Sequence, residues 1–367
     1  MVNCELRSGG AAGTSQVRRQ QGKLAMSYRL HFLVILLALL PCGRALAADA
    51  PVPQADLTAS VVKALTPLTR GAAGHRAEQT CFACHNQALP ILAMTTARSR
   101  GIAIDDDELK QQVRFIADFL GENRTRYAEG KGQGGQADTA GYALVALELG
   151  GWKADETTAA VTRYLLQRNA DLDYWRSNSQ RPPSEGSSFT TSYVALRGLA
   201  AFRTADQQKA YTNRREQLRR WLLKTPAKDH EDRVFRLLGL NLAGAGKSDI
   251  SAAAMELTDR QQADGGWAQL DGGEPAAATQ SDAYATGAAL VALHQAGGLA
   301  TTDPAYQRGL RYLLSAQKPD GSWHVFTRSK PFQKYYETGF PYGKDQFISS
   351  AATGWAATAL ALAIELK

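Results

Sequence analysis

The stretch Gln261-Gln262-Ala263-Asp264-Gly265-Gly266-Trp267 decides the fold of this chain, because it recurs as Gln317-Lys318-Pro319-Asp320-Gly321-Ser322-Trp323. Both copies have the form Gln-x3-Gly-x-Trp, and a degenerate copy without the glycine spans residues 167–175. The glycine permits the left-handed turn that closes a helix C-terminus, and the tryptophan can fold back on the preceding helix while its indole N–H finds a partner. The repeat therefore predicts helices that are stapled to their neighbours.

A second repeated element predicts buried helices. Ala143-Leu144-Val145-Ala146-Leu147 recurs as Ala289-Leu290-Val291-Ala292-Leu293, and each copy follows an acidic residue and a run of small residues. Helices so rich in small residues and so poor in charge are buried on most sides. Between them lie segments with charged faces, such as 207–224 and 304–316, which have the pattern of amphipathic surface helices. Buried and amphipathic helices are therefore expected to alternate.

Capping residues and breaks at glycine and proline predict twelve helices. The expected spans are 56–70, 88–100, 107–121, 138–150, 155–168, 188–203, 207–224, 231–244, 249–263, 282–297, 303–317 and 347–366. Alternating inner and outer helices close into a double ring, in which the first helix fills the outer gap beside the last. An open solenoid obeys the same repeat logic, but the sequence has no distinct capping repeat. The predicted fold is all-α, an (α/α)6 toroid.

These repeats and hairpins resemble the squalene-hopene cyclase and protein prenyltransferase superfamily over residues 85–367. The resemblance implies an (α/α)6 toroid, whereas a fold does not fix a function. Cyclases of this superfamily protonate an alkene with an Asp-x-Asp-Asp acid. The nearest run here, Asp105-Asp106-Asp107-Glu108, has the place of ordinary acidic residues in a first helical turn. The prenyltransferases hold zinc with Asp, Cys and His in the toroid, and no cysteine follows Cys84.

The segment Cys81-Phe82-Ala83-Cys84-His85 matches the attachment pattern of a c-type haem. Each thiol can add to one vinyl group of the porphyrin, and the adjacent imidazole then serves as the proximal iron ligand. Cys81 and Cys84 are therefore the expected covalent anchors of haem c, and His85 is its expected axial ligand. A redox disulfide and a zinc site are the alternatives, although no βαβ pattern lies nearby and no second Cys/His pair supplies further zinc ligands. The whole chain is also similar to a group of secreted bacterial proteins that join such a segment to a toroid.

The distal iron ligand stays open. Met94 lies nine residues after His85 on what is expected to be the same helix, so it is poorly placed to reach the opposite face of the iron. His75 and His324 are the other candidates, and an open distal face is a further alternative. Because the axial ligand shifts the potential substantially, electron transfer and oxygen or peroxide chemistry both stay open.

The first 47 residues have the pattern of a mis-assigned extension followed by a secretory signal peptide. Arg29 supplies the positive charge, residues 32–40 form an apolar run too short for a membrane span, and Ala45-Leu46-Ala47 is a small-x-small cleavage site. Cleavage removes Cys4 and Cys42 and leaves 36 basic and 34 acidic residues, a net charge of +2. We expect a periplasmic or secreted protein with no stable membrane span.

The inner helices are expected to surround a cavity. The candidate catalytic acids are Asp138, Asp282 and Asp345, which stand at the starts of inner helices and have helix capping as their alternative role. The further cavity candidates are Tyr142, Trp267, Tyr284, Trp323, His324, Tyr335, Tyr336 and Trp355. An acid amid aromatic rings can stabilise a cation or bind a polar-headed apolar ligand, whereas tryptophans more often pack in a core. The long segment 325–346 is the expected loop over this cavity.

Three parts are expected: the leader in 1–47, the first helix and haem-attachment segment in 48–87, and the toroid in 88–367. The predicted function is that of an exported c-type haem protein in redox chemistry or electron transfer with a ligand in the cavity. The alternatives are a terpenoid cyclase-like enzyme without haem and a binding scaffold. The expected partners are an apolar or terpenoid-like small molecule and a redox partner protein. A nucleic-acid partner is not expected, because only Arg214-Arg215 with Arg219-Arg220 approaches a basic face.

Overall fold

The computed structural model describes residues 50–331 and 334–366, which form thirteen α-helices and one two-stranded sheet. The chain divides into two units, 1–48 and 49–367, and the described residues belong to the second. The expected leader with Cys4 and Cys42 lies outside the described residues. Among the described helices, none combines the length and hydropathy that crossing a bilayer requires.

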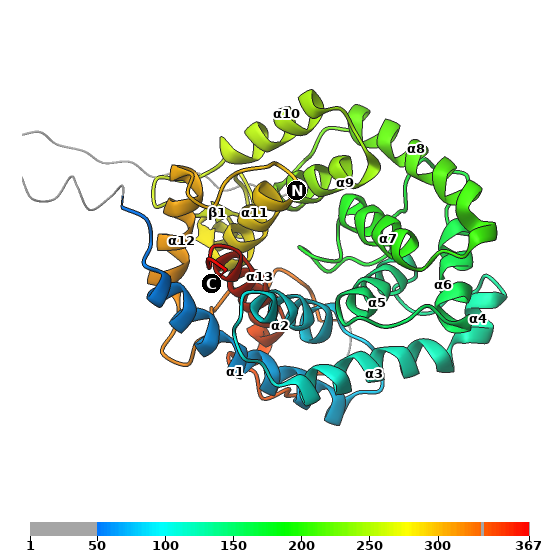
Figure 1. Cartoon of the computed structure of the whole chain (residues 1–367), viewed down its shortest axis with the longest axis horizontal. Coiled ribbons are helices and arrows are strands. Elements are labelled where there is room, and N and C mark those ends of the chain that lie inside the picture. Colours follow the sequence, from blue (N-terminus) through cyan, green and yellow to red (C-terminus); the bar gives the residue numbers. More distant parts are fainter. Residues whose placement is uncertain (1–49, 332–333, 367) are drawn as a thin grey trace, which may run out of the picture. The chain divides into compact units, whose positions relative to one another are not determined.

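Six helices form an inner ring. They are α2 (Leu89–Ser99), α5 (Ala137–Leu149), α7 (Ser188–Phe202), α9 (His230–Ala243), α11 (Ala283–Gln295) and α13 (Gln346–Leu362). Each contacts the next along the chain, and α13 also contacts α2, so the inner ring is closed (Figure 1). This closure confirms the predicted toroid and excludes the open solenoid.

Six further helices form the outer layer. They are α1 (Gln54–Glu78), α3 (Asp106–Glu122), α6 (Glu156–Gln167), α8 (Gln208–Lys224), α10 (Lys247–Thr258) and α12 (Pro304–Ala316). The first helix, α1, packs against α2, α3 and α13 and so fills the outer gap beside the last helix, as predicted (Figure 1). All twelve expected helices are present, and the short α4 (Arg124–Ala128), which packs on α6, was not predicted.

Small residues let the inner helices approach one another closely. A Cβ atom added to Gly287 of α11 would lie 2.6 Å from the backbone of Trp355 in α13. A Cβ atom added to Gly141 of α5 would lie 2.9 Å from the backbone nitrogen of Ala195 in α7. Because these contacts exclude even a methyl group, the small-residue pattern read from the sequence corresponds to helix pairs in backbone contact.

The repeated tryptophans staple three of the outer helices to the segments that follow them. The indole Nε1 of Trp267, of Trp323 and of Trp175 donates at 2.8 Å to the carbonyl oxygen of the residue ten positions earlier, near the end of α10, α12 and α6. All three side chains are fully buried. The degenerate copy at 167–175 therefore keeps the structural role of the repeat, although it has lost the glycine.

The repeat glutamines join one outer helix to the next. Gln261 donates to the carbonyl oxygen of Ala305 in α12 at 2.8 Å, and Gln317 donates to that of Ser60 in α1 at 3.0 Å. Each glutamine also donates to the carbonyl of the repeat glycine, at 2.8 and 2.9 Å. The second of these staples ties the end of the outer layer to its beginning, which closes the outer ring.

The repeat glycines were expected at helix ends, and this placement was wrong. Both lie in tight turns after their helices, with φ of +89° at Gly265 and +91° at Gly321. A Cβ atom would lie 2.7 Å from the carbonyl oxygen of Arg308 in the first case and 2.2 Å from that of Lys63 in the second. Glycine is required because the turn is left-handed and presses against the next outer helix.

The remaining elements are short. The strands β1 (Trp267–Ala268) and β2 (Ser281–Asp282) pair antiparallel just before α11. The other helical turns are η1 (Cys84–Ala88), η2 (Ala205–Gln207), η3 (Ala276–Thr279) and η4 (Gly343–Asp345). In the acidic run, Asp105 accepts a hydrogen bond from the backbone of Glu108 at 2.9 Å and caps α3, which is the ordinary role expected for it.

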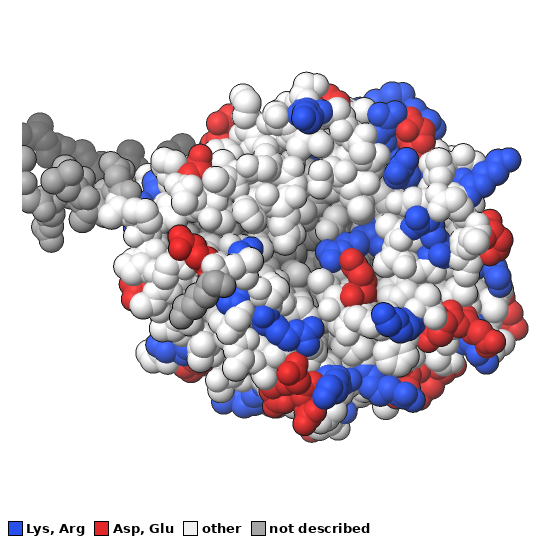
Figure 2. All heavy atoms as spheres, viewed as in Figure 1, with Lys and Arg blue, Asp and Glu red and all other residues white. Residues whose placement is uncertain are grey.

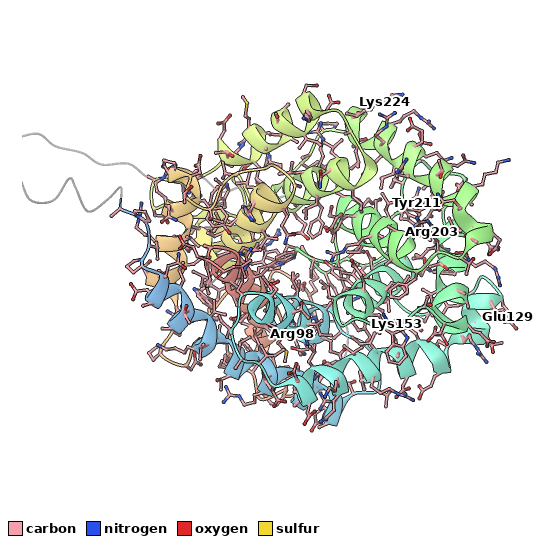
Figure 3. All side chains as sticks on the ribbon, in the orientation of Figure 1. Arg98, Glu129, Lys153, Arg203, Tyr211 and Lys224 are labelled. Atoms are coloured by element: carbon pink, nitrogen blue, oxygen red, sulfur yellow. The ribbon has the colours of Figure 1, made fainter. Side chains whose placement is uncertain are left out.

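The basic cluster of α8 is engaged within the fold. The Arg214 guanidinium lies 4.0 Å from the ring centroid of Trp175 and donates to the carbonyl of Leu172 at 2.7 Å. Arg219 and Arg220 pair with Glu216 of the same helix. Nearby, Arg203 lies over the ring of Tyr211 at 4.3 Å (Figure 3). Basic and acidic side chains are interspersed on the face seen in Figure 2, which is unlike a nucleic-acid interface.

Candidate functional site

The Cys-x-x-Cys-His segment connects α1 to α2 and opens onto the largest cavity that we describe. This cavity has a volume of about 620 Å³, within the range of ligand and cofactor sites. Cys81, Cys84 and His85 all line it. Its other walls come from the start of α5, from the loop 179–185 before α7, and from Lys330, Pro331 and Tyr336.

Cys84 faces an acidic side chain that the sequence did not point to. Its thiol donates to Oε1 of Glu185 at 2.9 Å, and Arg181 forms an ion pair with the other carboxylate oxygen. Cys84 is 3% exposed, and burial raises the pKa of its thiol to about 11. Cys81 is exposed and is not bridged to Cys84, so both sulfurs are thiols in the described structure.

His85 offers a buried nitrogen atom that has no hydrogen-bond partner among the described residues. Its Nδ1 lies 3.8 Å from Sγ of Cys84, and Nε2 is the buried atom without a partner. Burial lowers the pKa of His85 to about 3, so the imidazole is neutral and keeps a lone pair for a metal. The ring meets Phe347 edge-on, and Ser350 donates to the His85 carbonyl at 3.0 Å. The motif is therefore held against α13.

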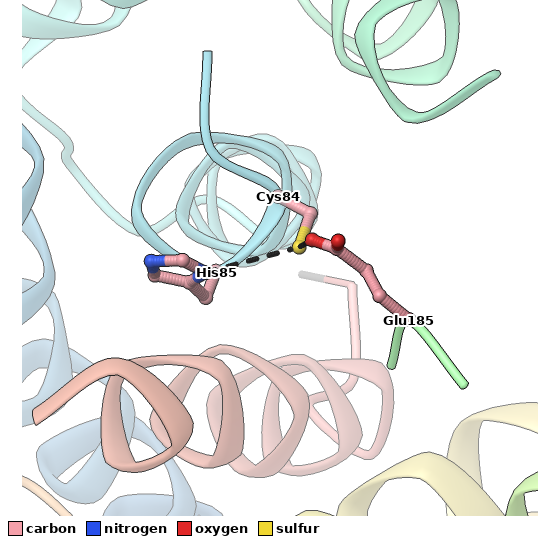
Figure 4. A group of neighbouring side chains, drawn as sticks. All are labelled: Cys84, His85 and Glu185. Carbon is pink, nitrogen blue, oxygen red and sulfur yellow. Dashed lines mark hydrogen bonds between the residues drawn. The ribbon is translucent and has the colours of Figure 1, made fainter. Parts of the chain in front are cut away.

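Cys84, His85 and Glu185 form a compact set of possible metal ligands (Figure 4). One donor atom from each lies within 4.8 Å of the others. Glu185 is 101 residues from Cys84, on a loop rather than a periodic element, so no local signal in the sequence could have found it.

His75 lines the cavity but is engaged at both ring nitrogens. Nε2 lies 2.7 Å from the carbonyl oxygen of Cys81, and Nδ1 lies 2.9 Å from the hydroxyl of Tyr336. Since a carbonyl only accepts, Nε2 carries the proton and Nδ1 accepts from the tyrosine. Burial also lowers the pKa of His75. In this arrangement His75 braces the Cys81 end of the motif.

The other two distal candidates do not line this cavity. His324 lies 2.8 Å from Oδ2 of Asp345 and stacks on Tyr342 with ring centroids 4.3 Å apart. Met94 is 1% exposed in the interior of α2. The structure therefore places these two side chains in the packing of the toroid.

The three candidate acids have different surroundings. Asp138 lines the cavity, accepts hydrogen bonds from Thr191 and Ser177, and has its pKa raised by burial. It is not the capping residue of α5. Asp282 caps α11 by accepting from Ala285 at 2.8 Å, and burial raises its pKa to about 6.

Asp345, the third candidate acid, lies just before α13 and accepts from the backbone of Thr327 at 2.9 Å. It therefore braces the long loop over the toroid end. Among the three, Asp138 alone lines the described cavity.

The aromatic candidates have different surroundings. Tyr142 and Tyr336 line the 620 Å³ cavity. Trp355 lines a space inside the inner ring, whereas Trp267 and Trp323 are the buried staples described above and line neither. Tyr284 is fully buried with its hydroxyl 3.2 Å from Glu231, and Tyr335 is 43% exposed.

The space inside the inner ring is small. Residues from all six inner helices line it, among them Tyr142, Phe235 and Trp355. Its volume is about 30 Å³. Because one water already needs roughly 10–15 Å³, this space holds no polyene or porphyrin. A larger guest has room at the end of the toroid where the Cys-x-x-Cys-His segment lies.

Comparison with known proteins relates the later helices to one family. Residues 234–361, from α9 to α13, match the squalene-hopene cyclase C-terminal domain. The squalene–hopene cyclase of Bradyrhizobium diazoefficiens is 38% identical over 115 residues, which are 29% of this chain and 16% of that enzyme. The chain thus spans about one sixth of this curated relative.

Solved structures are similar over most of the chain. Type II terpene cyclase MstE_D109A from Scytonema, in complex with the product merosterolic acid A, matches with a TM-score of 0.56 and 15% identity, covering 84% of this chain and 98% of its own. MstE_D109N in complex with the substrate geranylgeranyl dihydroxybenzoate gives 0.54 at 14% identity, with coverages of 84% and 98%. A protein from Actinoplanes gives 0.54 at 15% identity, with coverages of 82% and 100%. The chain therefore has the α/α-toroid fold of these solved structures.

Proposed function

We propose that this toroid is an exported carrier of one covalent haem, held at the end of the ring and used for electron transfer or related redox chemistry. The observation that carries this proposal is the cavity of about 620 Å³ that both thiols and the His85 imidazole line together. The buried Nε2 atom of neutral His85, which lacks a partner among the described residues, suits an iron ligand. Export is proposed from the signal-like pattern before residue 48.

Each residue of the cavity has a defined task in this proposal. Cys81 and Cys84 would hold the porphyrin through two thioether bonds, and each S–H would add across one vinyl group, so no oxidant would be needed. Arg181 and Lys330 line the same cavity and offer positive charge to the carboxylates of a porphyrin. His75 holds the carbonyl of Cys81 and so fixes the first anchor. A bound haem supplies one-electron chemistry whose potential depends on its axial ligands.

A second candidate is a terpenoid-binding or cyclase-like activity in the same cavity without haem. Its support is Asp138, a cavity carboxyl whose pKa is raised by burial, together with terpene cyclase neighbours solved with terpenoid ligands. A raised pKa favours the protonated acid that alkene protonation needs. Against it, Thr191 and Ser177 donate to this carboxylate and favour its charged form.

Expression together with a haem-ligation system separates the two candidates. The haem proposal expects a haem-stained band under denaturing conditions and a Soret band in the native protein. The cyclase candidate expects neither signal. It expects a cyclised product from a polyene such as squalene, and it expects that Asp138→Asn no longer forms this product. Protein that gives neither stain nor Soret band overturns the haem proposal.

A further inference from the structure

We propose that the haem-free chain binds one zinc ion through Sγ of Cys84, a ring nitrogen of His85 and a carboxylate oxygen of Glu185, with the fourth position open to the cavity. Thiolate, imidazole and carboxylate are all zinc ligands, and three protein ligands beside an open position are typical of catalytic zinc sites. The three donor atoms already lie within 4.8 Å of one another (Figure 4).

The surroundings of Glu185 support a ligand role. Arg181 holds one carboxylate oxygen, and the other points at Sγ of Cys84 at 2.9 Å. A metal ligand is commonly fixed in this way by a second hydrogen-bonded group. Glu185 is 9% exposed, so its carboxylate is set into the protein rather than lying on the surface.

The charges of the site also suit a divalent cation. Zinc binding breaks the Cys84 S–H bond, forms an S–Zn bond and releases the proton to solvent, so the ion meets one thiolate and one carboxylate. Their two negative charges balance the ion, and His85 contributes a neutral nitrogen. Arg181 adds a positive charge beside Glu185, and Asp138 is a further carboxyl group in the same cavity wall. Cys81 lines the cavity as well and offers a second thiol.

We expect that zinc and porphyrin cannot be bound at the same time, an expectation that rests on the proposed haem function. A thioether sulfur carries no negative charge and is a weak zinc ligand, so haem attachment at Cys84 would remove the thiolate that the zinc site requires. Glu185 belongs to the zinc site alone. Loss of Glu185 therefore separates the two proposals, because it weakens zinc binding while both anchors and the axial ligand of haem stay in place.

The test uses the whole mature chain, tag removed, produced without the haem-ligation system and kept reduced. Titration calorimetry with zinc chloride is expected to give one equivalent with release of protons. Cobalt(II) in place of zinc is expected to give a sulfur-to-metal charge-transfer band that Cys84→Ser abolishes. We expect Glu185→Gln to weaken zinc binding on the order of tenfold or more. The matched control is Glu148→Gln, because Glu148 pairs with Arg197 outside this site and its loss leaves zinc affinity unchanged.

The outcomes separate the zinc proposal from the haem proposal. Folded haem-free protein that binds no zinc, or a Glu185→Gln variant with unchanged affinity, overturns the zinc site whatever the haem result. Zinc binding in a chain that never stains for haem leaves the zinc site standing and ends the haem proposal. If both hold, Glu185→Gln still stains for haem, and wild type loaded with haem takes up no zinc. Circular dichroism of each variant verifies that it folds.

Discussion

The thiol of Cys84 donates to Oε1 of Glu185 at 2.9 Å, across 101 residues of chain. This bond joins the segment between α1 and α2 to the loop before α7, on the wall of the cavity. The two cysteines of the motif are chemically unequal, because Cys81 is exposed and Cys84 is buried.

In haem-free protein, Cys81 should react with iodoacetamide well before Cys84. The thiolate is the nucleophile, and burial raises the pKa of Cys84 to about 11, so at pH 8 roughly one thiol in a thousand is ionised. Peptide mass spectrometry after a timed reaction measures both sites. Unfolded protein is the control and should label both equally. Faster labelling of Cys84 than of Cys81 in the folded chain contradicts the described burial.

Loss of one indole staple should destabilise the ring. Trp267→Phe removes the indole donor to the carbonyl of Leu257, which keeps only the longer bond from the backbone of Arg260 at 3.3 Å, and it leaves part of a fully buried site unfilled, at a cost of about 1–3 kcal/mol. Urea unfolding measures the change in free energy. The control is Trp152→Phe. The indole of Trp152 donates to Oδ2 of Asp155 at an exposed position, so loss of this bond should lower the free energy of unfolding by less. If both variants lose the same free energy of unfolding, the stabilising role of the indole staple is contradicted.

Gly321 and Gly273 form a matched pair for separating backbone strain from a steric clash. Both have φ of +91°. A Cβ atom at Gly321 would lie 2.2 Å from the carbonyl of Lys63, whereas nothing lies within 4 Å at Gly273. Gly273→Ala should cost about 1–2 kcal/mol from the left-handed backbone alone. Gly321→Ala should cost clearly more, because α1 must shift, and thermal unfolding compares them. Similar losses of thermal stability in the two variants contradict the close contact between this turn and α1.

The stability of the ring should fall as pH rises from about 4.5 to about 8 because of Glu231. Burial raises the pKa of Glu231 to about 8, from an ordinary value of 4.5, and Asp229 and Asp232 add to the rise. The folded state therefore holds a proton that the unfolded state has lost over this range, so each pH step favours unfolding. Above pH 8 this contribution levels off. The unfolding midpoint should depend less steeply on pH in Glu231→Gln than in the wild type. An unchanged pH dependence contradicts the role given to Glu231.

The ring was predictable from the sequence because its signals are local. Trp267 and Trp323 sit at fixed distances from their helices, and the small-residue runs mark inner helices without any knowledge of the fold. The predicted site was less complete because it depends on contacts between distant residues. Glu185 and Cys84 are 101 residues apart and are brought together by the fold, so no spacing rule in the sequence predicts their contact.

For several residues near one end of the ring, the sequence left two roles open. The repeat tryptophans were predicted to staple helices and were also candidates for the cavity wall, and the structure confirms the staples, because their indole N–H groups bind helix carbonyls. Asp138 had capping as its alternative role, but it accepts from Thr191 of the neighbouring inner helix α7. A polar residue at a helix start has the same local sequence whether it caps or crosses to a neighbour, which is why sequence alone could not separate these roles.

The central claim is that both thiols and His85 hold one haem in the cavity at the end of the ring. Its most direct test is the intact mass of the denatured chain after expression with the haem-ligation system, with Cys81→Ala/Cys84→Ala as control. We predict that the wild type gains the mass of one haem and that the control gains none. A folded wild-type chain whose mass equals that of the polypeptide alone contradicts the account.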